Sequence, residues 1–249
     1  MPPLTGIQII AHRGFSARAP ENTLSALDAA LEAGADAVEF DLRTAACGTP
    51  VLFHDAMLGR TTNGVGPMGR RPVGHLKALD AGGWFGAAFK DERIPTQEEA
   101  LRHLAGRIEQ VYQDIKGYRE MEDLDRMVEI TRKTDMAAAT VFVSSDWVVM
   151  NRLRKVAPEI QRAYLVEEAA AFPEALDRAV VDEGSFLSLE FDFALGNPDG
   201  VHEARQNDVG LVAWTVNDPD SAGRLAALGV HRITTDAVAD LLSWRDSQG

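Results

Sequence analysis

The stretch Leu211-Val212-Ala213-Trp214-Thr215-Val216 is followed by Asn217, by the pair Asp218-Pro219, and later by Gly229. The first six residues are mostly apolar or β-branched, which predicts a buried strand over Leu211–Val216. Asp218 can cap a helix, Pro219 suits its first position, and Gly229 is a common residue just past a helix end. The stretch therefore predicts one strand and one helix, the latter over Pro219–Leu228, followed by the β-branched run Arg232–Thr235.

The same alternation of strand and helix runs through the rest of the chain. It predicts further strands at Ile7–Ala11, Ala37–Leu42, Val111–Lys116, Thr140–Ser144, Arg162–Val166 and Phe186–Phe191. It predicts helices from a cap at Asn22 to Gly34, from a Thr96/Glu99 capping box onward, and at Met121–Lys133, Asp146–Val156, Phe172–Val181 and Asp199–Asn207. Repeated β-α units favour a parallel sheet, so the chain is predicted to be an α/β protein with a closed (β/α)8 barrel. An open doubly wound sheet is the alternative. The strands number eight if Val51–His54 is a hairpin extension of the strand before it.

One segment interrupts this rhythm. Residues 56–93 contain many glycines and no sustained periodicity, which predicts an insertion after the second strand region of a single domain spanning residues 1–249. We expect the insertion to lie over the carboxyl end of the barrel. Trp84 and Phe85 are expected to form its core, with a role as lid anchor as the alternative.

Composition excludes several classes of protein. The chain has 25 Lys and Arg against 38 Asp and Glu, a net charge of −13, so it lacks the basic surface that nucleic acids require. The chain has no run of about 18 or more apolar residues, so the sequence predicts no transmembrane helix. The single cysteine, Cys47, rules out an intramolecular disulfide and indicates a reducing compartment. Because no basic segment precedes the first strand, we expect a cytoplasmic protein.

Acidic side chains lie where predicted strands end. Glu39 and Asp41 are two residues apart on one strand and so point to the same face, where they repel unless a cation lies between them. Asp114 ends another strand, with Lys116 on the same face. Three converging carboxylates would form an oxygen-rich site for a hard divalent cation, Mg²⁺ or Ca²⁺. An ion pair between Asp114 and Lys116 is compatible with this site.

Two histidines come after strands as well. His12, with Arg13, comes directly after the first strand, and His54 ends the run that begins at Val51. Imidazoles at these positions suit a general base and a general acid. Gly14 would let the backbone approach a ligand closely. The glycine pattern of residues 64–69 does not indicate a dinucleotide site, because no strand leads into it and no helix comes after it.

Taken together, these motifs resemble the glycerophosphodiester phosphodiesterase family in order and spacing over nearly the whole chain. The resemblance rests on His12-Arg13-Gly14, Pro20-Glu21-Asn22-Thr23, Glu39-Phe40-Asp41, His54-Asp55, Arg60-Thr61-Thr62, Ile94-Pro95-Thr96, Asp114-Ile115-Lys116 and Trp214-Thr215-Val216-Asn217. It implies a TIM barrel, a divalent cation, and hydrolysis of small-molecule glycerophosphodiesters to glycerol 3-phosphate and an alcohol.

The resemblance also implies a role for each matching residue. Glu39, Asp41 and Asp114 would bind the metal, and His12 and His54 would form the acid–base pair. The substrate would contact Arg13, Lys116 and Trp214. The family usually has Glu where this chain has Asp114. Two alternatives to the predicted activity are hydrolysis of lysophospholipids on the same fold and a catalytically weakened protein that only binds glycerophosphodiesters.

Overall fold

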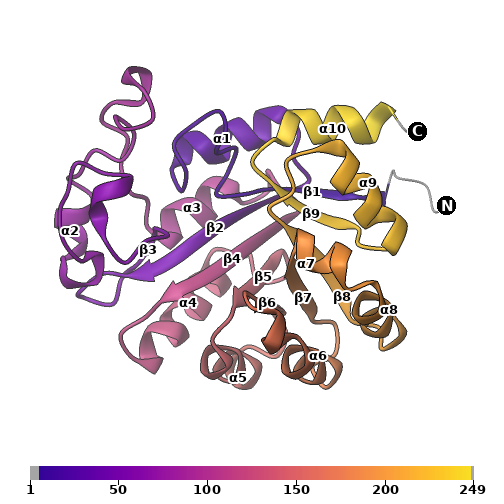
Figure 1. The fold of residues 1–249 in the computed structure, drawn as a ribbon. Coiled ribbons are helices and arrows are strands. Elements are labelled where there is room, and N and C mark those ends of the chain that lie inside the picture. The colour runs from indigo at the N-terminus through magenta and orange to yellow at the C-terminus, as the bar shows by residue number, and fades with distance from the viewer. Residues whose placement is uncertain (1–5, 248–249) are drawn as a thin grey trace.

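The computed structural model describes residues 6–247, which form a closed barrel of eight parallel strands surrounded by helices (Figure 1). Around the barrel the strands are arranged in the order β1, β9, β8, β7, β6, β5, β4, β2, and pairing of β1 with β2 closes the ring. The closed ring confirms the (β/α)8 prediction and excludes the open sheet. The strands are β1 (Gln8–Ala11), β2 (Ala37–Thr44), β4 (Gln110–Gly117), β5 (Thr140–Ser144), β6 (Gln161–Val166), β7 (Phe186–Glu190), β8 (Gly210–Trp214) and β9 (Arg232–Thr235).

The ninth strand, β3 (Pro50–Leu52), pairs antiparallel with β2 and lies outside the ring. It is the hairpin extension that the sequence predicted, although Phe53 and His54 come after the strand rather than belong to it. The Phe53 N–H donates to the carbonyl oxygen of Asp41 at 3.0 Å. The hairpin therefore returns His54 to the end of β2.

All the predicted helices are present. The helices between strands are α1 (Leu24–Ala33), α3 (Gln97–Leu104), α4 (Met121–Lys133), α5 (Trp147–Val156), α6 (Phe172–Val180), α8 (Pro198–Gln206) and α9 (Pro219–Leu228), and α10 (Val238–Ser247) comes last. The cap of α1 is Thr23, not Asn22, because the Thr23 side chain accepts from the Ala26 N–H. A short helix that the pattern did not reveal, α7 (Phe191–Gly196), begins where the Glu190 side chain accepts from the Phe193 N–H.

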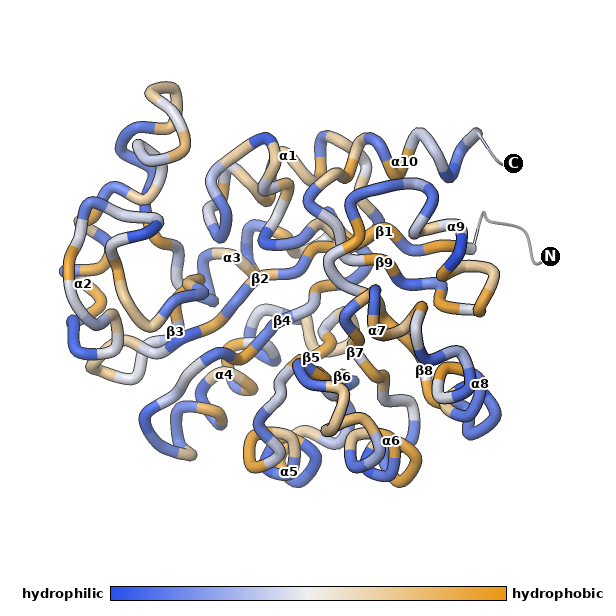
Figure 2. The backbone as a smooth tube through the Cα atoms, viewed as in Figure 1, coloured by the Kyte–Doolittle hydropathy of each residue, from blue (hydrophilic) through white to orange (hydrophobic). Residues whose placement is uncertain are grey.

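Apolar side chains form two layers of core around the sheet. The larger cluster packs between the strands and the surrounding helices, and a smaller one fills the barrel with residues such as Ile10, Tyr112, Val143, Leu165 and Val212. Figure 2 shows apolar and polar stretches alternating around α5 and α6, as expected for helices with one buried side. No helix within residues 6–247 is both long and apolar enough to cross a bilayer.

The insertion, residues 56–93, lies beside the end of β2 and the β3 hairpin rather than over the barrel (Figure 1). It contains α2 (Val73–Leu76) and three short 3-10 turns. Its own cluster includes Leu58, Met68 and Leu76, which pack against the hairpin. Trp84 is not part of that core: 43% of its surface is exposed, and its ring lies perpendicular to that of Phe85. The expectation that Trp84 and Phe85 form the core of the insertion was wrong, since the aliphatic side chains take that place.

Candidate active site

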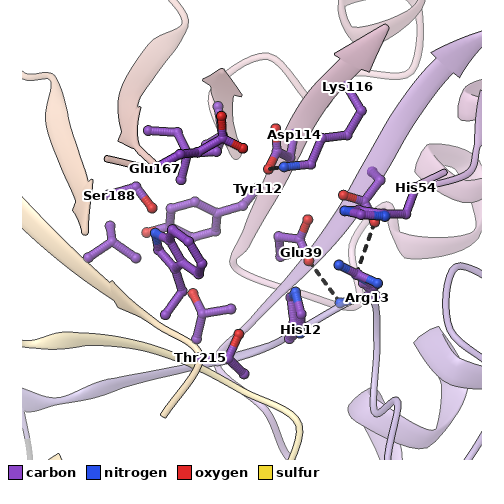
Figure 3. A pocket seen from close by; sticks show the side chains of 16 residues that line it. His12, Arg13, Glu39, His54, Tyr112, Asp114, Lys116, Glu167, Ser188 and Thr215 are labelled. Carbon is purple, nitrogen blue, oxygen red and sulfur yellow. Dashed lines mark hydrogen bonds and ion pairs between the residues drawn. The ribbon is translucent and has the colours of Figure 1, made fainter. Parts of the chain in front are cut away.

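The register of the barrel brings the predicted carboxylates together. Asp41 of β2 lies directly opposite Asp114 of β4, and Glu39 is two residues earlier on the same face of β2. One carboxylate oxygen from each of the three lies within 4.8 Å of the others. All three side chains are buried, and Figure 3 shows Glu39 and Asp114 in the same pocket as His12 and His54. The three acids therefore form one cluster at the carboxyl ends of the strands.

Burial of like charges makes this cluster electrostatically unfavourable by itself. Burial, reinforced by the neighbouring Asp41 carboxylate, raises the pKa of Glu39 to about 8. Burial also raises the pKa of Asp114, although Lys116 partly opposes the shift. The Lys116 Nζ lies 2.7 Å from Asp114 Oδ2, whereas Oδ1 is buried without a hydrogen-bond partner.

These features fit a bound cation. A buried carboxylate oxygen without a partner needs a positive group, and three carboxylates supply oxygen ligands of the kind that Mg²⁺ and Ca²⁺ prefer. The cluster within the described residues has no thiolate or imidazole among its members, which makes it a poor zinc site.

Arg13 and Asn22 contact the carboxylate cluster and fix the positions of its side chains. The Arg13 backbone N–H donates to Glu39 Oε2 at 2.8 Å, and its Nε lies 3.2 Å from Asp41 Oδ2. Asn22 bonds Asp41 twice: its Nδ2 donates to Oδ2 at 2.8 Å, and its Oδ1 accepts from the Asp41 N–H at 3.0 Å. Asn22 thus positions Asp41 instead of capping α1. Because the Arg13 guanidinium already has carboxylate partners, its contact with substrate stays a prediction.

The structure shows a reason for glycine at position 14 that the sequence did not indicate. Its φ of 78° is rarely adopted by other residues, and a Cβ there would lie 2.6 Å from the backbone carbon of Ala26. Gly14 therefore lets the loop after β1 pack against α1, and the close approach of a ligand to its backbone stays a prediction.

His12 is oriented by a carboxylate that sequence reasoning missed. Its Nδ1 lies 2.7 Å from Asp236 Oδ1, at the residue after β9. Asp236 also accepts from Ser16 Oγ at 2.8 Å and from Asn217 Nδ2 at 3.1 Å. Burial lowers the pKa of His12, but the hydrogen bond with Asp236 and the charge of Glu39 outweigh it and raise the pKa overall. An acidic residue directly after a predicted barrel strand was the signal that could have revealed Asp236.

His54 has an equivalent partner next to it in the chain. Its Nδ1 lies 2.6 Å from Asp55 Oδ1, and its carbonyl oxygen accepts from the Arg43 Nε at 2.6 Å. Both imidazoles are thus bound through Nδ1 to a carboxylate, which leaves Nε2 of each ring for a substrate.

The cluster and both histidines line a cavity of about 190 Å³. All eight predicted site residues line it, and the other lining residues are Tyr112, Val143, Leu165, Glu167, Ser188, Val212, Thr215 and Thr234. Glu167 and Ser188 lie on the side away from His54 (Figure 3), and neither was predicted from the sequence. The indole Nε1 of Trp214 is buried without a hydrogen-bond partner. None of the described residues 56–93 lines the cavity.

Three carboxylates and two carboxylate-bound imidazoles lie at the carboxyl ends of the parallel strands, where barrel enzymes place their active sites. This fold and this site define the protein as a (β/α)8-barrel enzyme. Residues 12–240 match the glycerophosphoryl diester phosphodiesterase family. The chain therefore belongs to this family, the members of which are phosphoric diester hydrolases.

Individual relatives agree with this assignment. A glycerophosphodiester phosphodiesterase from Caldanaerobacter subterraneus is 30% identical over 94% of this chain and 96% of its own. The structure of an Oleispira antarctica phosphodiesterase in complex with the product sn-glycerol-3-phosphate is 31% identical, with a TM-score of 0.87 and 96% of each chain covered. A glycerophosphodiester phosphodiesterase from Agrobacterium tumefaciens is 29% identical, with a TM-score of 0.82, over 95% of this chain and 99% of its own.

Proposed function

We propose that this enzyme hydrolyses glycerophosphodiesters to glycerol 3-phosphate and an alcohol, with a divalent cation and two histidines as acid and base. The observation that carries the proposal is the grouping of three buried carboxylates and two carboxylate-bound imidazoles in one cavity. The product named for the Oleispira antarctica relative supports the substrate class.

Glu39, Asp41 and Asp114 would hold the cation, Mg²⁺ or Ca²⁺. When bound, such a cation withdraws charge from a phosphoryl oxygen and so favours attack at phosphorus. The three carboxylates supply the negative charge that attracts it, while Asn22 and Arg13 keep Asp41 in place. The shorter Asp114, where the family usually has Glu, still presents a buried oxygen that has no other partner.

The two histidines would move the protons. We assign His12 as the base that removes a proton from the attacking oxygen as the new P–O bond forms. His54 would donate a proton to the alkoxide as the old P–O bond breaks, so one proton enters the enzyme and one leaves it. The attacking group is water or the neighbouring glycerol hydroxyl, the latter giving a cyclic phosphate that water then opens. Arg13 and Lys116 would contact the phosphate, and Trp214 would line the substrate pocket.

The cavity favours water-soluble substrates over lysophospholipids. A volume of about 190 Å³ suits a small polyol phosphate, and the walls carry the polar residues Ser188 and Glu167. The insertion adds no apolar residue to the lining of this cavity, where a lysophospholipid would need a surface for its acyl chain.

The decisive experiment measures release of glycerol 3-phosphate from several head-group esters, with and without metal. We expect a chelator to abolish activity and Mg²⁺ or Ca²⁺ to restore it. His12→Ala and His54→Ala should each reduce turnover about 10²- to 10⁴-fold. Full activity in excess chelator would remove the cation from the mechanism, and near-normal turnover of both variants would defeat the acid–base assignment. Binding of substrate without turnover under all conditions would favour the weakened binding protein.

A further inference from the structure

We propose that Arg60, contributed by the insertion, is a positioning residue for the acid step. It fixes the Asp55 carboxylate that orients His54. Through Glu21 it also connects Asp55 and His54 to the metal-binding carboxylates. The proposal rests on the proposed function, because it concerns the histidine assigned to protonate the leaving alcohol.

The guanidinium of Arg60 contacts two carboxylates at once. Its Nε donates to Asp55 Oδ2 at 2.6 Å and its Nη2 to Asp55 Oδ1 at 3.1 Å. On the other side, Nη1 donates to Glu21 Oε2 and Nη2 to Glu21 Oε1, both at 2.7 Å. This planar, doubly bidentate arrangement fixes the orientation of a carboxylate in a way that a single ammonium group does not.

The position of Arg60 is itself determined by the fold of the insertion. Arg60 ends the 3-10 turn Leu58–Arg60, and Leu58 is fully buried in the cluster that packs against the β3 hairpin. The Leu58 N–H donates to the Gly66 carbonyl, and its own carbonyl accepts from Thr62 Oγ1. The backbone that carries Arg60 is thus held on both sides.

Asp55 depends on this contact. One of its oxygens bonds both His54 and Arg60, and its side chain is 25% exposed, so without Arg60 the carboxylate could turn toward water. The hydrogen bonds from Arg60, assisted by His54, lower the pKa of Asp55 to about 2. Asp55 therefore stays ionised at neutral pH and can stabilise a protonated imidazole.

The far side of Arg60 leads to the metal-binding carboxylates. Glu21 Oε1 also accepts from Arg13 Nη1 at 2.9 Å, and Arg13 Nε lies 3.2 Å from Asp41 Oδ2. Alternating charges thus run without interruption from Asp55 through Arg60, Glu21 and Arg13 to Asp41. The insertion lines none of the cavity, yet it touches the active site through these charges.

A change of leaving group separates a positioning role from a merely structural one. Choline leaves as an alkoxide that needs a proton, whereas 4-nitrophenol leaves as a stable phenolate that does not. With the choline ester of glycerol 3-phosphate, Arg60→Ala should lower kcat about 10- to 100-fold, the size of effect that misplaced catalytic groups produce. With the 4-nitrophenyl ester, kcat should stay within about twofold of the wild type. Arg60→Lys should recover only part of the loss, because an ammonium group lacks the fork.

Two further variants complete the test. Arg71→Ala is the matched control, since Arg71 belongs to the same insertion and donates to the Val65 carbonyl; both esters should react at wild-type rates. His54→Ala supplies the reference and should show the same dependence on leaving group. If Arg60→Ala does not fold, Arg60→Gln replaces it.

The outcomes distinguish the two proposals. Equal loss with both esters in the Arg60 variants, or no loss at all, overturns the positioning role while a leaving-group effect in His54→Ala leaves the proposed function intact. If His54→Ala itself slows both esters equally, the assignment of His54 as acid fails, and with it the step that Arg60 would serve.

Discussion

This barrel buries two groups of charged residues, and the two groups differ in how far their charges are paired. On the outer side of β6, Arg162 and Asp182 form an ion pair whose side chains are 5% and 4% exposed. The guanidinium donates to both oxygens of Asp182 and to the carbonyls of Ala157 and Ile160, and Tyr164 adds a further bond to Asp182. In the active site, Glu39, Asp41 and Asp114 are buried to a similar degree, yet they are like charges, and one oxygen has no partner.

The pKa values show what this difference means. Burial raises the pKa of Asp182, but Arg162 outweighs it and lowers the pKa overall. In the active site burial and the neighbouring carboxylates act together, and the pKa of Glu39 rises to about 8. Burial by itself therefore does not identify a functional charge. A functional site is indicated instead by buried like charges that the protein compensates only in part.

The largest effect on stability is expected when the buried Arg162–Asp182 ion pair loses its positive charge. Arg162→Met leaves Asp182 buried and unpaired, and should lower the free energy of unfolding by about 3–5 kcal/mol, measured in urea. The matched control is Arg132→Met at the exposed pair with Glu159, which should cost less than about 1 kcal/mol. Equal losses in the two variants would mean that the Arg162 pair contributes no more than a surface contact.

The active-site cluster should gain stability from a ligand. Mg²⁺ or Ca²⁺ at 100 times its Kd should raise the free energy of unfolding by about 2.7 kcal/mol, detected as a higher Tm. Asp41→Asn should largely remove this gain without removing the fold. A rise in Tm of the same size in that variant would place the cation elsewhere.

Without metal, at neutral pH, Glu39→Gln should stabilise the protein, by about 1 kcal/mol, because folding forces the Glu39 carboxyl beside two carboxylates to take up a proton, a cost that Gln avoids. The pKa of Glu39 lies near 8 in the folded protein against an ordinary 4.5, so the folded state holds its proton longer than the unfolded state. The metal-free wild type should consequently lose stability as pH rises from about 4.5 to 8. The variant should lose less over the same range, as measured by thermal unfolding. Parallel curves would show that Glu39 does not titrate in this way.

The smallest effect concerns acid pH. Because the pKa of Asp182 is lowered by folding, its contribution to stability is present above the unfolded value and is lost as pH falls through the folded one. The difference in Tm between wild type and Asp182→Asn should thus shrink as pH is lowered from about 6 toward 3. A difference that grows over this range would contradict the lowered pKa.

The sequence was most informative where local and tertiary preferences agree. Met121–Lys133 and Pro219–Leu228 form helices with the predicted bounds, since periodicity and end signals coincide there. The convergence of Glu39, Asp41 and Asp114 was also predictable in outline, because parallel strands end at one edge of the barrel. The register that places Asp41 opposite Asp114 was not, since no pattern within one strand specifies its neighbour.

Contacts between distant parts of the chain account for the rest. His12 and Asp236 are 224 residues apart, and only closure of the barrel brings them together. Asn22 has the side chain of a helix cap and precedes a helix, but its bonds to Asp41 take precedence. The reason for Gly14 could not be predicted from the residues around it either, because the neighbour that excludes a larger side chain is Ala26 of α1.

The pairing of β2 with β4 shifts between Leu42 and Arg43. Before that irregularity the acidic side chains face inward; after it the chain turns back toward β3. Residues gained or lost beyond the shift can be absorbed in the connecting segment. A slip of one position before it would instead exchange the two sides of the strand and put Phe40 and Leu42 inside the barrel. The register of β2 with β4 before the shift is therefore what keeps Glu39 and Asp41 facing the cavity.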